Sequence, residues 1–120
     1  MNELINNVVK WFHAKGIIEN SHPLKQLEKT QEELTETRDA AVKIKNLNDL
    51  AHYGGLYDIE DETKNLIHEL KDGIGDTVVT LIGVCEMYGF TLEECLQQAY
   101  DVISKRTGVI VDGKFVKDLV

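Results

Sequence analysis

Two segments of this sequence carry acidic residues at spacings that place carboxylates on one side of a helix. The first segment reads KTQEELTE and holds Glu33 and Glu36 three residues apart. The second reads HELKDGIGD and holds Asp72 four residues before Asp76, with Glu69 one further turn earlier. Residues three, four and seven apart share a face of a helix. Each segment therefore offers a pair of carboxylates to one site.

Asp76 has an unusual setting, because it is the only charged residue between Gly73 and Cys85. The residues that follow it, TVVTLIGVC, are apolar on every side of a helix, which is typical of a segment enclosed by other parts of a protein. Ala40 and Ile44 continue the acidic side of the first segment in the same way. Desolvating a carboxylate costs several kcal/mol unless it is paired or bound to a metal. We therefore expect these carboxylates to face inward, toward a cation.

The type of ligand indicates which cation this would be. All-oxygen ligands suit Mg²⁺ or Mn²⁺, whereas zinc normally draws on His or Cys. The four histidines have no HxxxH spacing, and the two Glu-x-x-His pairs of a di-iron helical bundle are not present. Mg²⁺ that keeps open coordination positions is suited to holding phosphates and activating water. The alternative is that each acidic stripe is a solvated face without a ligand.

Charge and composition limit the possible partners. The 120 residues include 13 Lys and Arg against 21 Asp and Glu, which gives a formal net charge of −8. Such a surface repels the backbone of long nucleic acids, although a metal ion can reverse the local sign for a small phosphorylated ligand. No apolar run reaches the roughly 18 to 20 residues of a membrane helix, and Glu3 stands where a signal peptide would be positive. We expect a cytoplasmic protein without nucleic-acid or membrane partners.

Apolar periodicity and cap residues predict four helices and one hairpin. The expected helices span Asn2–Lys15, Pro23–Lys45, Asp61–Tyr88 and, after a capping box of Thr91 and Glu94, a last segment that ends near Arg106. Residues 46–62, with two glycines and no clear period, predict a connecting loop. Near the end of the chain, Asp112-Gly113 between alternating apolar residues predicts a tight hairpin turn.

These elements predict an all-α protein, a four-helix bundle with a short C-terminal β-hairpin. Each amphipathic helix can bury its apolar stripe against the other three. A chain of this length supports one compact core, so residues 1–120 are expected to form a single domain. Cys85 and Cys95 both fall inside apolar helical patterns and are expected to be buried thiols.

The order of these motifs resembles that of the MazG-type nucleoside triphosphate pyrophosphohydrolases, all-α enzymes whose signature is EExxE followed by ExxD on the next long helix. The first half is matched by Glu32, Glu33 and Glu36, with Gln26 and Lys29 where family members often have them. The later stretches KRTG and DGKFVKD are similar to the ending of small phage-type members. The resemblance covers most of the chain, with the motifs in the right order.

The second half of the signature departs from the family pattern. Gly73 stands three residues before Asp76, where the family has a glutamate. The fourth carboxylate would then be Asp72, in the adjacent position, or Glu69 if ELKD is itself the ExxD motif. This departure favours an alternative to catalysis, a helical module that binds a nucleotide or a partner protein.

The resemblance implies Mg²⁺-dependent hydrolysis of nucleoside or deoxynucleoside triphosphates to the monophosphate and pyrophosphate, by a homodimer or homotetramer. The implied metal ligands, with Mn²⁺ as a possible substitute ion, are Glu33, Glu36, Asp76 and either Asp72 or Glu69. Glu32 or Glu36 would align the attacking water. The implied phosphate-binding cations are Lys29, Lys105 and Arg106. The resemblance does not identify the residues that recognise the base; Trp11 or Tyr53 could stack on it, although an aromatic side chain is more often part of the core.

Overall fold

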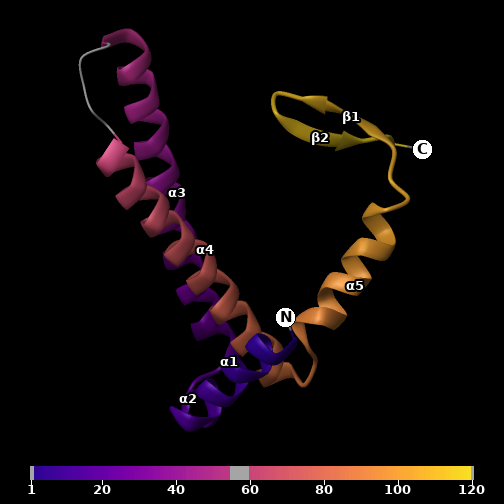
Figure 1. Ribbon diagram of the computed structural model, residues 1–120. Helices are drawn as coiled ribbons and strands as arrows, with labels where there is room; N and C mark the ends of the chain where they lie inside the picture. The colour runs from indigo at the N-terminus through magenta and orange to yellow at the C-terminus, as the bar shows by residue number, and fades with distance from the viewer. Residues whose placement is uncertain (1, 55–59, 120) are drawn as a thin grey trace. The chain divides into compact units, whose positions relative to one another are not determined.

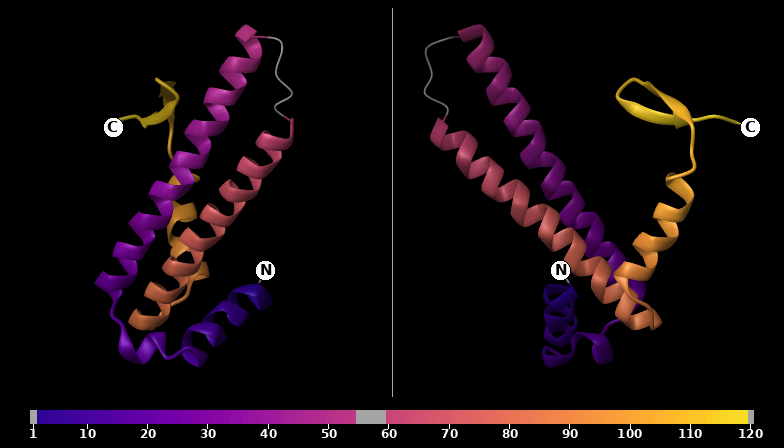
Figure 2. Two further views of the ribbon diagram at one scale, coloured as in Figure 1. Left: turned by 90° about the vertical axis from the view of Figure 1, so that its left-hand side faces the viewer. Right: turned by 45° about the vertical axis from the view of Figure 1, so that its right-hand side comes forward.

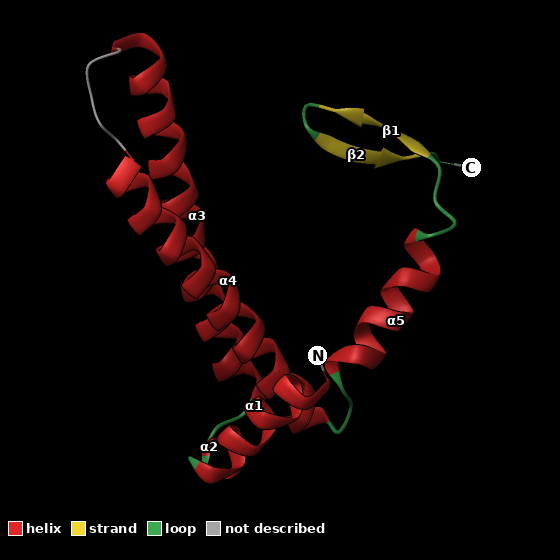
Figure 3. Ribbon diagram, viewed as in Figure 1, coloured by secondary structure: helices red, strands yellow, loops and turns green. Residues whose placement is uncertain are grey.

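The computed structural model describes residues 2–54 and 60–119, with side chains described outside residues 2 and 51–54. The chain divides into two compact units, residues 1–89 and 90–120, which we describe separately. The first unit contains α1 (Asn2–Ala14), α2 (Ile17–Asn20), α3 (Pro23–Gly54) and α4 (Glu60–Tyr88) (Figure 1). The second contains α5 (Leu92–Ile103), β1 (Gly108–Val111) and β2 (Lys114–Lys117). The all-α class with a C-terminal hairpin is thus confirmed (Figure 3), whereas the single domain and the packing of α5 on the other helices stay predictions.

Local signals at the helix and strand ends are confirmed in the second unit. The Thr91 hydroxyl accepts a hydrogen bond from the Glu94 amide at 3.1 Å, and the Glu94 carboxylate accepts one from the Thr91 amide at 3.4 Å. The hairpin pairs Val109 with Val116 in an antiparallel register. Its turn has positive φ at both central residues, 50° at Asp112 and 75° at Gly113, as a two-residue hairpin turn requires.

The two thiols that were expected to be buried differ in exposure. Cys85 on α4 is buried, whereas Cys95 on α5 is exposed, so the burial expected for Cys95 is wrong.

The expected loop at residues 46–62 is largely wrong. α3 continues through Gly54, and α4 begins at Glu60. Leu47 continues the buried side of α3, and Lys45 forms a 2.8 Å ion pair with Asp49 one turn later. The partial burial of Leu47 and the Lys45–Asp49 ion pair both support a helix in a segment where the asparagines suggested a loop. The remaining part of that expected loop, residues 55–59, lies outside the described residues.

α3 and α4 lie side by side and antiparallel in all views, and their contact is a seam with the spacing of a coiled coil (Figures 1 and 2). Residues alternately three and four apart are partly or fully buried on both helices. On α3 they are Thr30, Glu33, Thr37, Ala40, Ile44 and Leu47. On α4 they are Thr63, Leu66, Leu70, Gly73, Thr77, Thr80, Val84 and Met87. The middle of the seam is therefore made of small residues.

α3 and α4 approach closely at Gly73. A Cβ atom added there would collide with the Thr37 side chain and lie 3.1 Å from Thr37 Cα. Nearby, the Thr30 and Thr80 hydroxyl oxygens are 2.7 Å apart across the seam. The Thr37 hydroxyl donates to the Glu33 carbonyl oxygen at 2.7 Å, so this polar group keeps a partner at the contact.

α1 packs onto the far end of α4 through Phe12. This side chain is 2% exposed, and its ring fills the space above Gly83, where a Cβ would lie 2.6 Å from Cζ. Burying such a side chain stabilises the fold by about 1.5–3 kcal/mol. Trp11 makes an edge-to-face contact with Phe12, with ring centroids 5.2 Å apart. The buried Phe12 thereby orients the indole ring of Trp11.

Substitutions at two neighbouring glycines of α4 should have opposite effects on stability. We expect Gly73→Ala to lower the free energy of unfolding by about 1–3 kcal/mol, because the new methyl group forces the helices apart. Gly75→Ala is the matched control. A Cβ there meets nothing within 4 Å, so the better helix former should raise the free energy of unfolding by about 0.5–1 kcal/mol. Urea denaturation measures both values, and equal effects would contradict the close contact at Gly73.

Candidate metal centre

Glu33 is the sheltered carboxylate of the site. Its side chain is 13% exposed, because it occupies a seam position between Thr30 and Thr37. Loss of solvent at this position raises the pKa of Glu33, and the negative charges of Glu36 and Asp76 and a hydrogen bond with Glu36 raise it further. The Lys29 ammonium, 3.8 Å away, opposes these effects only in part. Glu36 on α3 and Asp76 on α4 are thus near enough to Glu33 for their charges to act on it.

Asp76 does not have the desolvated setting that its apolar neighbours suggested. Its side chain is exposed in the described chain. Ile74 and Val78, on the same stretch of α4, are 52% and 38% exposed, so apolar residues around Asp76 do not enclose it.

Of the carboxylates that were expected to face inward, Glu33 is sheltered at the seam, whereas Glu36 is exposed, as Asp76 is. Ala40 and Ile44, which indicated this side of the helix in the sequence, are fully and partly buried in the same seam.

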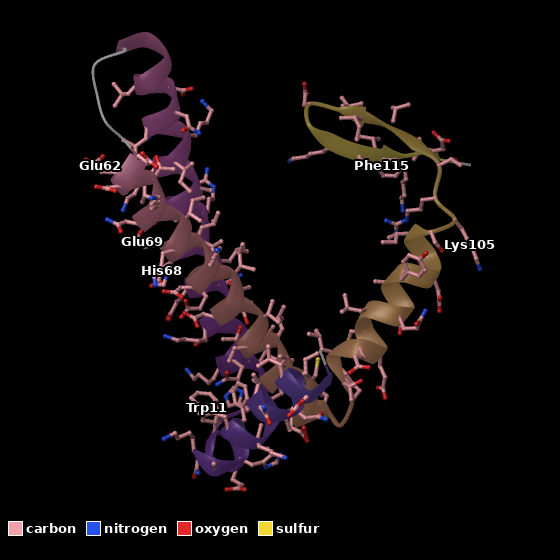
Figure 4. The ribbon with its side chains drawn as sticks, viewed as in Figure 1. Trp11, Glu62, His68, Glu69, Lys105 and Phe115 are labelled. Atoms are coloured by element: carbon pink, nitrogen blue, oxygen red, sulfur yellow. The ribbon has the colours of Figure 1, made fainter. Side chains whose placement is uncertain are left out.

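Asp72 and Glu69 are both exposed on α4. Asp72 lies one turn before Asp76, and its Oδ2 is 3.5 Å from the Nε2 of His68. Glu69 lies beside His68 on the same helix (Figure 4). Asp76, one turn after Asp72 on α4, is the residue of this helix whose charge raises the pKa of Glu33. Which of the two supplies a fourth ligand stays a prediction.

The three carboxylates fit Mg²⁺ by ligand type. They offer only oxygen atoms, the ligands that Mg²⁺ and Mn²⁺ prefer. Within the described residues, no three His, Cys, Asp or Glu side chains are grouped closely enough to hold a metal ion. The charges of Glu36 and Asp76 nevertheless disfavour ionised Glu33, and a bound cation would relieve that repulsion. Binding would require side-chain movements that bring these oxygens onto one ion.

A cavity of about 410 Å³ opens beside these carboxylates. Glu33, Asp76 and Lys29 line it together with Trp11. A second cavity of about 340 Å³ shares Trp11 and Asp76 and adds Asn7. Each volume is in the range of small-molecule sites. Trp11 is 46% exposed, so one site offers carboxylates, a cation and an aromatic face.

The expected phosphate-binding cations lie in different units. Lys29 is in the first unit, where its ammonium is 3.3 Å from the Glu32 carboxylate. That hydrogen bond and the charges of Glu32 and Glu33 raise the pKa of Lys29. Lys105 and Arg106 follow α5 in the second unit (Figure 4), so their role at this cavity stays a prediction. The side chain of Tyr53 lies outside the described residues.

The raised pKa of Glu33 predicts that removing its charge stabilises the metal-free chain. The folded state favours protonated Glu33, so the free energy of unfolding falls as the pH rises from the ordinary glutamate pKa through the raised one. In EDTA, Glu33→Gln should therefore melt a few degrees above the unsubstituted chain at pH 7 to 8, with the difference shrinking toward pH 4. Glu28→Gln, at an exposed position of α3, is the control and should change the melting temperature little. A less stable Glu33→Gln chain at pH 8 would contradict the repulsion.

Comparisons of the chain with known protein families, with curated proteins and with solved structures found no match. A functional assignment therefore depends on the carboxylates at the seam, the cavities beside them, and the resemblance of their motifs to the MazG-type signature.

Proposed function

We propose that the chain hydrolyses nucleoside or deoxynucleoside triphosphates to the monophosphate and pyrophosphate with Mg²⁺. The observation that carries this proposal is the setting of Glu33. Its carboxyl group is sheltered and repelled by Glu36 and Asp76, at a cavity that Lys29 and Trp11 also line. Such an arrangement suits a cation and a triphosphate better than it suits an unliganded core.

The residues of the cavity have distinct roles in this proposal. Glu33 and Asp76 would hold the ion from opposite helices, with Glu36 beside them. Mg²⁺ bound there would supply charge neutralisation for the phosphates. Lys29 offers an ammonium group to a phosphate oxygen, and the exposed face of Trp11 offers a stacking surface to a base. Glu32 or Glu36 would orient the attacking water.

Self-association is part of the same proposal. Several apolar side chains of α3 and α4 are exposed in the single chain, between 37% and 57% of their surface: Leu27, Leu34, Ile67, Ile74 and Val78. A second copy would cover them, as a homodimer or homotetramer. None of the described helices is long and apolar enough to span a membrane. We also propose that the protein is located in the cytoplasm.

The alternative, a non-catalytic helical module that binds nucleotide or a partner protein, is favoured by one observation. Gly73 replaces the glutamate of the family signature, and the Thr37 contact leaves no room for a side chain at that position. The ligand set is therefore built differently from the signature. Release of pyrophosphate by the purified chain distinguishes catalysis from binding alone.

Hydrolysis should require a divalent cation and Asp76. A panel of ribo- and deoxyribonucleoside triphosphates, incubated with Mg²⁺ and analysed for both products, should give monophosphate and pyrophosphate. EDTA should stop the reaction, and Mg²⁺ or Mn²⁺ should restore it. Asp76→Asn should lower kcat/KM by at least about 100-fold, since it removes a carboxylate ligand. Asp49→Asn is the matched control, because it removes a carboxylate near the C-terminal end of α3, away from Glu33, and it should retain activity. Undiminished turnover in chelator would remove this mechanism.

The fourth carboxylate can be identified by its effect on the metal requirement. Asp72 lies closer to Asp76 along α4 than Glu69 does, so both aspartates can reach one ion from the same face. We expect Asp72→Ala to raise the Mg²⁺ concentration for half-maximal activity about tenfold or more, and Glu69→Ala to raise it far less. Circular dichroism checks that both variants remain helical. The reverse ranking would assign the role to Glu69 and to the ELKD motif.

A further inference from the structure

Two cavities of the first unit share one wall. The larger, of about 410 Å³, and the smaller, of about 340 Å³, are both lined by Trp11, Asp76 and Val79. Trp11 comes from α1 (Figure 4), whereas Asp76 and Val79 lie about one turn apart on α4. A ligand bound at this wall can therefore extend into both cavities, with one part of the ligand in each.

The two cavities differ in charge. The smaller cavity adds Asn7 and Val8 to the shared wall, so Asp76 is the only charged residue among its described lining residues. The larger cavity adds the ammonium groups of Lys25 and Lys29. Phosphate groups would gain charge-assisted hydrogen bonds from these lysines only in the larger cavity. The smaller cavity instead suits a neutral heterocycle, which valine side chains, an indole face and the Asn7 amide can contact.

Lys25 and Lys29 form a row of cations that leads away from the proposed ion site. Lys25, Lys29 and Glu33 are four residues apart, so they follow one side of α3 with about 6 Å of helical rise per step. The Lys29 ammonium is next to carboxylates, 3.3 Å from Glu32 and 3.8 Å from Glu33. The Lys25 ammonium is 3.5 Å from Glu28, but these side chains are 63% and 65% exposed, so their pair is weak. Lys25 can therefore turn to a phosphate without disturbing the carboxylates of the site.

We infer that a nucleoside triphosphate lies across the shared wall, with its nucleoside beside Asn7 in the smaller cavity and its β- and γ-phosphates along Lys29 and Lys25. This inference rests on the proposed function. Hydrolysis to monophosphate and pyrophosphate breaks the bridge between the α- and β-phosphates, so this bridge has to lie at the ion that Glu33 and Asp76 would hold. Asp76 lines both cavities, which puts the α-phosphate at the shared wall. The reverse orientation would send the phosphates into the cavity whose described lining residues include no cation.

This orientation gives Lys25 and Asn7 separate roles in binding. Lys25 contacts the terminal phosphate, which a nucleoside diphosphate lacks, so it favours triphosphates over diphosphates. Asn7 contacts the nucleoside and leaves the phosphates untouched. The two hydrolysis products should therefore depend on different residues of the cavities.

Binding of the two products, measured separately, tests the orientation. Calorimetric titrations of the full-length chain in Mg²⁺ use pyrophosphate and, out of dAMP, dCMP, dGMP and dTMP, the monophosphate that binds the unsubstituted chain most tightly. Lys25→Ala should raise the Kd of pyrophosphate about tenfold, because it removes a charge-assisted hydrogen bond, and leave the Kd of the monophosphate within about twofold. Asn7→Ala should raise the Kd of the monophosphate about fivefold and leave that of pyrophosphate within about twofold.

Matched controls make the same substitutions outside the cavities. Lys10 and Asn6 lie on α1 and are not among the described lining residues of either cavity. Lys10→Ala and Asn6→Ala should leave both dissociation constants within about twofold. The opposite pattern for Lys25→Ala and Asn7→Ala, or equal effects on both products, would overturn the orientation even where the chain hydrolyses triphosphates. If neither product binds the unsubstituted chain, the proposed function fails together with the orientation.

Discussion

The close contact between Gly73 and Thr37 sets the geometry on which the site depends. It lets α3 and α4 approach without an intervening side chain, and the Thr30–Thr80 hydroxyl pair shows the same register further along. From Thr30 to Thr37 the chain runs forward along α3, and their partners run backward along α4 from Thr80 to Gly73, as two antiparallel helices in one register require. That register places Glu33 level with Thr77, next to Asp76. A small-residue seam thus positions a carboxylate from each helix at one cavity.

The same register makes the carboxylates costly for the unliganded fold. Glu33 loses solvent at the seam while Glu36 and Asp76 repel it, so the folded chain disfavours its ionised form. An aliphatic residue at this seam position would pack without that repulsion. Retaining a glutamate there therefore lowers the stability of the unliganded chain, and binding a cation would recover that stability by mass action. If the proposed cation binds, stability and ligand binding are therefore coupled through one side chain.

Local sequence signals predicted helix caps and turns well. The length of α3 and the exposure of side chains depend instead on contacts between residues far apart in the sequence. The Thr91–Glu94 capping box and the Asp112-Gly113 turn are formed by residues close in sequence, so each could be read directly. The continuation of α3 through residues 46–54 depends partly on Leu47 meeting α4, and its asparagines pointed to a loop. The exposure of Asp76 depends on what covers α4, which no local pattern states. The inward side of Glu33 could be read from Ala40 and Ile44, but the close contact of Gly73 with Thr37 could not, because it joins residues far apart in the sequence.

The helix contact at Gly73 leaves no room in this chain for the glutamate that the EExxE…ExxD pattern would have three residues before Asp76. A residue three positions before Asp76 lies on the seam side of α4, and the Thr37 hydroxyl, with Thr37 Cα 3.1 Å from the added Cβ, occupies the space where its side chain would begin. A glutamate there would push α3 away and disturb the position of Glu33 relative to Asp76. Asp72 and Glu69 lie off the seam, about 40° and 20° around the helix from Asp76. A carboxylate at either position can share the Asp76 side of α4 while the helices stay in contact. A fourth carboxylate ligand, if the proposed metal site forms, would therefore have to come from a position such as Asp72 or Glu69 and not from position 73.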